Sequence, residues 1–184
     1  MKRVFLLLLL QLTFVFGGYS GHQGAYIDMY DTALGLYYKG VSNKPKKSNF
    51  IISVSNYSIT NIAVFDPKNN TSKMIFPSYN QNITDILFEM EYKDGKIVFN
   101  DIRYNRIKNN QNISKRSVKN RILIETYNRD KKETTLWSCT KDAKNLKKVA
   151  TFSKDYTWHI DVKNEKIRVI YSKNNQFKIE SFDW

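Results

Sequence analysis

Two residues of one predicted strand have the types and the spacing for acid–base chemistry. The chain has two histidines, His22 and His159. His159 lies two residues before Asp161, and side chains two apart on a strand point to the same face. A carboxylate beside an imidazole can orient it for proton transfer, so this pair is the catalytic candidate. No nucleophile is recognisable nearby, and the alternative is a polar outer face of the strand opposite Trp158.

The sequence offers no motif for a metal ion or a cofactor, and we expect neither. Its single cysteine, Cys139, and its two distant histidines do not match the ligand spacings of zinc sites. Neither a calcium-binding loop nor a glycine-rich phosphate loop is present. With no second cysteine to pair with, Cys139 is expected to be buried or half-buried in a strand.

Positive charge is the strongest indication of a partner. Lysine and arginine outnumber the acidic residues by 30 to 17, which gives a formal net charge of +13. The stretch from Arg106 to Lys119 is polar and has no periodicity, and we interpret it as a long mobile loop. The basic residues in and around this loop are the candidate binding residues: Arg103, Arg106, Lys108, Lys115, Arg116, Lys119 and Arg121.

Such a basic loop can bind a polyanion by diffuse electrostatic attraction. For a secreted protein the available polyanions are anionic lipid headgroups and cell-surface polymers, so we expect a partner of this kind or a protein, and not a nucleic acid. A solvated surface that only keeps the protein soluble is the alternative.

The N-terminus has the layout of a secretory signal peptide. Two basic residues precede an apolar run from Val4 to Phe16, and two glycines follow at once. The run is shorter than the roughly 18–20 residues that span a bilayer. We therefore expect removal of residues 1–17, or of a few more with a cut as late as residue 20. The mature protein would be a single domain of residues 18–184, secreted or periplasmic, without a transmembrane segment.

Strand signals dominate the remainder of the chain. Runs of aromatic and β-branched residues alternate with clusters of Asn, Asp, Lys and Gly, and no segment keeps a helical period. This pattern predicts an all-β, antiparallel domain. The expected strands are 34–38, 49–55, 60–66, 72–76, 84–92, 96–104, 120–127, 134–140, 146–152, 156–162, 166–172 and 176–182.

One hairpin is predicted in more detail from its alternation. Its turn should be Lys163–Glu165, and its buried face should carry an aromatic and three aliphatic residues: Trp158, Ile160, Ile167 and Val169.

Residues 62–99 and 136–170 form a possible internal repeat. Each unit is predicted as strand, polar turn, strand, short connection, strand, tight turn and strand. Lys93–Gly95 and Lys163–Glu165 mark the tight turns. Four-strand units of this order are typical of propeller blades or related meanders.

The second unit resembles a known family. Leu136–Thr151, together with Trp158–Asp161 and Lys166–Ile170, is similar to a blade of the TolB-type β-propellers, and Asp94–Phe99 is similar to the end of the same motif. The resemblance covers about 70 residues. Ile160 stands where the family motif has a proline. The resemblance implies a blade-like fold and a role in binding other proteins.

Chain length restricts the architecture. A closed propeller needs at least four blades of about 40 residues; the units of this chain are longer, so only about two to three fit. We expect an antiparallel meander of blade-like sheets, open or completed by another chain, with a β-sandwich as the alternative.

The function expected from these features is that of a non-enzymatic binding module for a protein or an anionic envelope or host surface component. The alternatives are a secreted hydrolase of unknown substrate and a structural or colonisation factor that self-associates through exposed strand edges.

Overall fold

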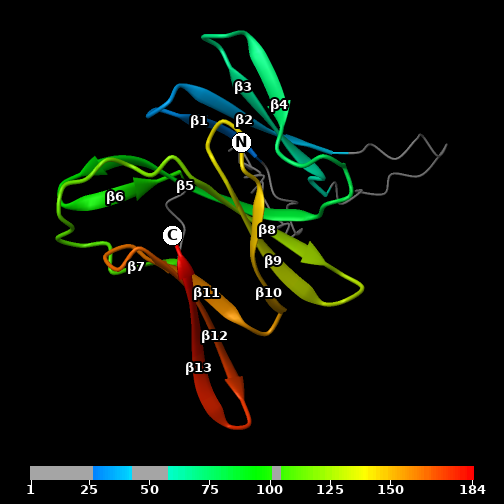
Figure 1. Cartoon of the computed structure of the whole chain (residues 1–184), viewed down its shortest axis with the longest axis vertical. Helices are drawn as coiled ribbons and strands as arrows, with labels where there is room; N and C mark the ends of the chain where they lie inside the picture. Colours follow the sequence, from blue (N-terminus) through cyan, green and yellow to red (C-terminus); the bar gives the residue numbers. More distant parts are fainter. Residues whose placement is uncertain (1–26, 43–57, 101–104) are drawn as a thin grey trace, which may run out of the picture.

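The computed structural model describes residues 27–42, 58–100 and 105–184 (Figure 1). All regular elements in these residues are β-strands, arranged in three sheets, none of them closed into a barrel. The all-β prediction is therefore confirmed. The described part of the chain contains no helix with the length and hydropathy needed to cross a membrane.

The sheets follow one another along the chain, except that β7 of the third sheet lies between two strands of the second. The N-terminal sheet has the order β1-β2-β3-β4 and consists of β1 (Asp28–Asp31), β2 (Leu36–Val41), β3 (Asn61–Asp66) and β4 (Thr71–Met74). The middle sheet has the order β10-β9-β8-β5-β6 and consists of β5 (Ile83–Lys93), β6 (Lys96–Phe99), β8 (Ile122–Asn128), β9 (Glu133–Cys139) and β10 (Lys147–Ser153). The C-terminal sheet has the order β13-β12-β11-β7 and consists of β7 (Ile107–Lys108), β11 (Thr157–Asp161), β12 (Lys166–Lys173) and β13 (Gln176–Asp183).

Most of the predicted strands are present, with bounds shifted by a few residues. Two strands were not expected from the sequence: β1, and the two-residue strand β7, which pairs in parallel with β11. The predicted strand 49–55 and the predicted signal peptide lie outside the described residues.

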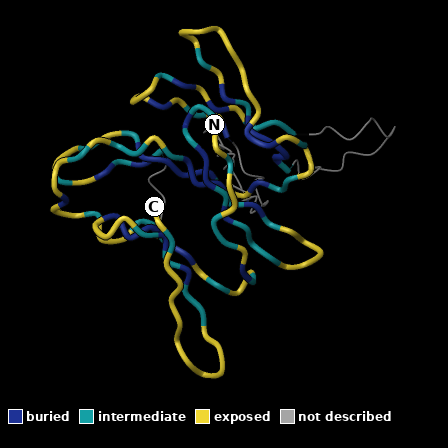
Figure 2. The backbone as a smooth tube through the Cα atoms, viewed as in Figure 1, coloured by how far each residue is buried: buried dark blue, intermediate teal, exposed yellow. Residues whose placement is uncertain are grey.

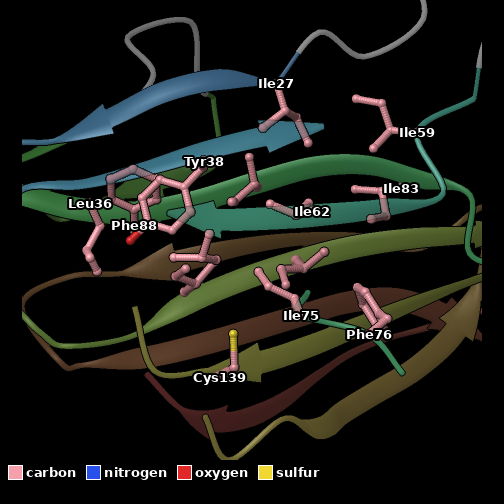
Figure 3. Close-up of a cluster of buried hydrophobic side chains, with 14 residues drawn as sticks. Ile27, Leu36, Tyr38, Ile59, Ile62, Ile75, Phe76, Ile83, Phe88 and Cys139 are labelled. Carbon is pink, nitrogen blue, oxygen red and sulfur yellow. The ribbon is translucent and has the colours of Figure 1, made fainter. Parts of the chain in front are cut away.

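The middle sheet lies between two hydrophobic cores. Ile86 and Phe88 of β5 face the N-terminal sheet and belong to one buried cluster with Tyr38 and Ile62. Figure 3 shows Phe88 beside Tyr38 in this cluster. Leu87, between them on the strand, faces the C-terminal sheet. Strands buried on both faces need a continuous apolar run in place of an alternating one. This explains the uninterrupted run at 86–88 and a second run, Ile122–Ile124, on the neighbouring strand β8.

The hairpin formed by β11 and β12 agrees with its prediction. Ile160 pairs with Ile167 and Trp158 with Val169, and all four side chains are buried. The turn between the strands includes the predicted residues 163–165, and Glu165 adopts a positive φ of 51°. The rigid hairpin fixes the position of the polar residues on its other face.

The possible repeat has the predicted order of strands, but each unit is divided between two sheets. In the first unit, the β3–β4 hairpin lies in the N-terminal sheet and the β5–β6 hairpin in the middle sheet. In the second unit, β9–β10 lies in the middle sheet and β11–β12 in the C-terminal sheet. The sheet boundary therefore falls at the same point of both units, between their two hairpins.

Candidate functional site

Asp161 is the last residue of β11, and its side chain accepts hydrogen bonds from the turn that follows this strand. Its carboxylate accepts hydrogen bonds from Asn109 Nδ2 (2.9 Å), Asn164 Nδ2 (2.8 Å) and Arg168 (3.2 Å). Burial alone would raise the pKa of Asp161, but these hydrogen bonds outweigh it and lower the pKa to about 2. In the described residues its hydrogen-bond donors do not include His159, so the carboxylate does not orient the imidazole.

His159 is half-buried on the same strand. Burial lowers the pKa of its imidazole, and the positive charges of Lys108 and Arg168 lower it further, against the opposing effect of Asp161. The imidazole is therefore neutral at neutral pH and can donate or accept one hydrogen bond.

The candidate basic residues do not form the solvated loop that we expected. Arg116 donates to both oxygens of Glu89, each at 2.7 Å, and the Glu89 side chain is fully buried. The Nζ of Lys119 lies 2.8 Å from Glu165, and its backbone N–H donates to Glu89. These two side chains are therefore not free in solvent, because Arg116 supplies the counter-charge of a buried carboxylate and Lys119 pairs with Glu165.

Arg106 occupies a different place. Its guanidinium pairs with Glu125 and lies 3.9 Å from Asp85. The same group sits over the ring of Trp158, 4.3 Å from the centroid, a cation–π geometry. The indole N–H of Trp158 also donates to Glu125, at 2.5 Å. Arg106 is thus held by contacts from β8 and β11.

The remaining candidates are scattered. Arg121 donates to the backbone carbonyl of Asp183 at 3.2 Å. Lys108 and Lys115 have exposed side chains. Arg103 lies outside the described residues. The candidates with described positions therefore belong to separate environments, and Arg106 and Lys108 are the two that line a common pocket.

This pocket, called the cationic pocket below, has a volume of about 500 Å³ and lies between the middle and C-terminal sheets. The segment that leads into β7 forms one side, and the strands β8 to β12 contribute the others. Its lining residues are Asn105, Arg106, Lys108, Glu125, Thr134, Phe152, Lys154, Tyr156, Thr157, Trp158, His159 and Ile170.

The pocket carries more positive than negative charge. Three cationic side chains, those of Arg106, Lys108 and Lys154, line it together with a single carboxylate, that of Glu125. Glu125 is already bound by Arg106 and by Trp158. Lys108 and Lys154 are exposed and form no ion pair within the described part of the chain. Their ammonium groups are therefore available to an anionic ligand.

Stacked aromatic rings form a wall of the pocket. Tyr156 stacks on Phe152 with centroids 6.3 Å apart and planes inclined by 2°. It also stacks on Tyr171 at 4.3 Å and 3°. Stacking of this kind fixes the plane of the Tyr156 ring. The pocket thus combines positive charge with a flat apolar surface.

Three residues of the pocket were not expected from the sequence to be site residues: Lys154, Tyr156 and Glu125. They come from β8 and from the short connection between β10 and β11, which meet only when the two sheets pack. Local spacing carries no signal for this juxtaposition.

No group of three or more His, Cys, Asp or Glu side chains in the described ranges is placed to hold a metal ion. Comparisons with known proteins give no match, whether to a protein-family model, to a curated protein or to a solved structure. The site is therefore interpreted from its own geometry.

Proposed function

We propose that this protein is a non-enzymatic binding module that acts outside the cytoplasm and binds an anionic polysaccharide through the cationic pocket. The observation that carries the proposal is the pairing of two free ammonium groups, Lys108 and Lys154, with the fixed ring of Tyr156 in one concavity. Export is supported by the basic residues and the apolar run at the N-terminus.

The chemistry of the pocket favours a sugar polymer with negative groups. Ammonium groups attract carboxylate or sulfate, and an aromatic face offers contact area for the apolar side of a sugar ring. The neutral imidazole of His159 can hydrogen-bond a hydroxyl group. Exposed ion pairs contribute only about 0.2–1 kcal/mol each, so useful affinity requires these contacts to act together along a polymer.

The finer description of the fold belongs to the same proposal. Support for a blade-like meander comes from three sheets, antiparallel except for the β7–β11 pair, with the middle one buried on both faces. In such an arrangement the pocket is a groove between adjacent blades.

Binding to heparin oligosaccharides, followed by calorimetry across a salt series, tests this function. The affinity should fall steeply between 0.1 and 1 M salt, because the Debye length shrinks from about 10 to about 3 Å. Lys108→Ser with Lys154→Ser should weaken binding at least tenfold at 0.1 M salt. The control is Lys68→Ser with Lys73→Ser, which removes the same charge from exposed positions around β4.

If both double variants lose the same heparin affinity, net charge alone attracts heparin, and the pocket is not the binding site. A Tyr156→Ser variant adds a second criterion. It should weaken binding and leave the salt dependence unchanged, because it removes a contact surface and no charge.

A further inference from the structure

β13 is an edge strand with unusual exposure. In the described residues it pairs with β12 alone, at the end of the C-terminal sheet. Figure 1 shows the β12–β13 hairpin extending away from the other strands, and Figure 2 shows its outer part as exposed. Two large apolar side chains of this strand face solvent, Phe177 at 68% and Ile179 at 51% exposure. A long edge strand with apolar side chains is a template for pairing with another chain.

The free hydrogen-bonding groups of β13 can be assigned from the hairpin. Asn174 and Asn175 have φ angles of 52° and 58° and join the paired residues Lys173 and Gln176, which is a two-residue type I′ turn. The pair that closes such a turn exchanges both hydrogen bonds, and bonded and non-bonded pairs then alternate along the ladder. It follows that alternate residues direct N–H and C=O away from β12; these are Phe177, Ile179 and Ser181.

We propose that two copies of the chain associate through β13 as an antiparallel pair in which Ile179 lies opposite Ile179 of the second copy. The two sheets then continue into one across the two-fold axis. In this register Lys178 lies opposite the second copy's Glu180, and by symmetry the same ion pair forms twice. On the other face, Phe177 and Ile179 of both copies form one apolar cluster, next to Ile170 of β12.

The charges of Lys178 and Glu180 favour this register over the two registers in which the two-fold axis is shifted by one residue. Moving the axis by one residue towards the turn places Lys178 opposite Lys178. Moving it by one residue the other way places Glu180 opposite Glu180. Like charges directly opposite on paired strands are destabilising. The alternation of lysine, isoleucine and glutamate at 178–180 is thus self-complementary about Ile179 alone.

Sedimentation velocity of the protein over a concentration series tests the pairing. The wild type should dimerise, and Lys178→Glu or Glu180→Lys should each raise the dissociation constant at least tenfold. The double variant Lys178→Glu with Glu180→Lys should restore dimerisation, because it exchanges the two charges and keeps them opposite.

A control separates the proposed contact from one within the chain. Tyr171 donates a hydrogen bond of 2.7 Å to Glu180, and Tyr171→Phe removes it while both charges stay. This variant should dimerise like the wild type. A wild type that stays monomeric up to about 100 μM, far above a dissociation constant of about 1 μM for a specific dimer, would overturn the proposal. A double variant that remains as weak as the single ones would overturn the register.

Discussion

Arg116 and Glu89 form two parallel hydrogen bonds of 2.7 Å, and they join the segment before β8 to the centre of the middle sheet. The Glu89 carboxylate is fully buried and also accepts a hydrogen bond of 2.9 Å from the indole N–H of Trp184. The same carboxylate therefore holds the connecting segment, β5 and the residue after β13 together. This makes Arg116 a structural residue in a stretch that sequence alone assigned to solvent.

Replacing Arg116 should destabilise the fold. Arg116→Ser leaves a buried carboxylate without its counter-charge, and the free energy of unfolding should fall by about 3 kcal/mol. Lys115→Ser, at the exposed neighbouring position, should change it by less than about 0.5 kcal/mol. Urea unfolding followed by circular dichroism measures both. Similar values for the two variants would show that the Glu89 contact is not energetically important.

A second buried ion pair joins the N-terminal and middle sheets. Lys141 Nζ lies 3.0 Å from Asp31 Oδ1 and 2.6 Å from the backbone carbonyl of Glu89, and both charged side chains are almost fully buried. Lys141→Met should cost about 3–5 kcal/mol, because it leaves the Asp31 carboxylate buried and unpaired.

The double variant Lys141→Met with Asp31→Leu should recover much of that loss, since removal of both charges also removes the cost of burying them. Urea unfolding of the two single variants and the double variant completes the cycle. Additive losses would indicate that the two groups do not interact.

The elements of this fold could be predicted from local patterns, but their assembly could not. Alternation and turn residues indicate the hairpins, as in β11–β12, because both signals lie within a few residues. The pairing of β5 with β8 joins strands that are separated along the chain by β6, β7 and a long connection. No local signal specifies it, and the division of each repeat unit between two sheets follows from such distant pairings.

The candidate site shows the same limit. His159 and Asp161 lie on one strand, as the alternating pattern predicted. The role of Asp161, however, depends on a hydrogen bond from Asn109, which lies 52 residues earlier in the chain. Glu89 is next to Met90 and Glu91 in a strand with alternating polarity, where a charged residue is expected to face solvent. Its burial depends on Arg116, so the sequence could not reveal that the basic segment is partly neutralised.

At low pH, Asp161 should no longer contribute to the stability of the folded protein. Its pKa is lowered from 3.8 to about 2 in the folded protein, so the folded state binds the proton less readily than the unfolded state. The resulting stabilisation is fully present above about pH 4 and is lost as the pH falls towards 2. Asp161→Asn should therefore cost about 2 kcal/mol at pH 7, and its unfolding curve should approach that of the wild type near pH 2. A difference independent of pH would contradict the assignment.

Cys139 should be unreactive in the native protein. Burial raises the pKa of its thiol to about 12, with a further contribution from Asp142, so almost no thiolate exists at neutral pH. Iodoacetamide should label the chain slowly in buffer and rapidly in urea. The chain has a single cysteine, so mass spectrometry reads this one site directly. Rapid, complete labelling of the folded protein would show that the thiol is accessible.

Trp158 belongs both to the core between the middle and C-terminal sheets and to the lining of the cationic pocket. Two substitutions separate its role in stability from its role in binding. Its side chain is 6% exposed, its N–H donates to Glu125, and Arg106 covers its ring. Trp158→Ala removes a large buried ring and should cost about 3–5 kcal/mol of unfolding free energy.

Trp158→Phe keeps an aromatic ring under Arg106 and removes the N–H, so it should cost about 1–2 kcal/mol, mainly through the lost hydrogen bond to a carboxylate. Heparin binding at 0.1 M salt is the second measurement. Because Arg106 keeps its ion pair with Glu125 in the phenylalanine variant, binding should change less than twofold. A large loss of binding in this stable variant would mean that the indole N–H positions the pocket charges, and a loss of stability below about 1 kcal/mol in Trp158→Ala would remove Trp158 from the core.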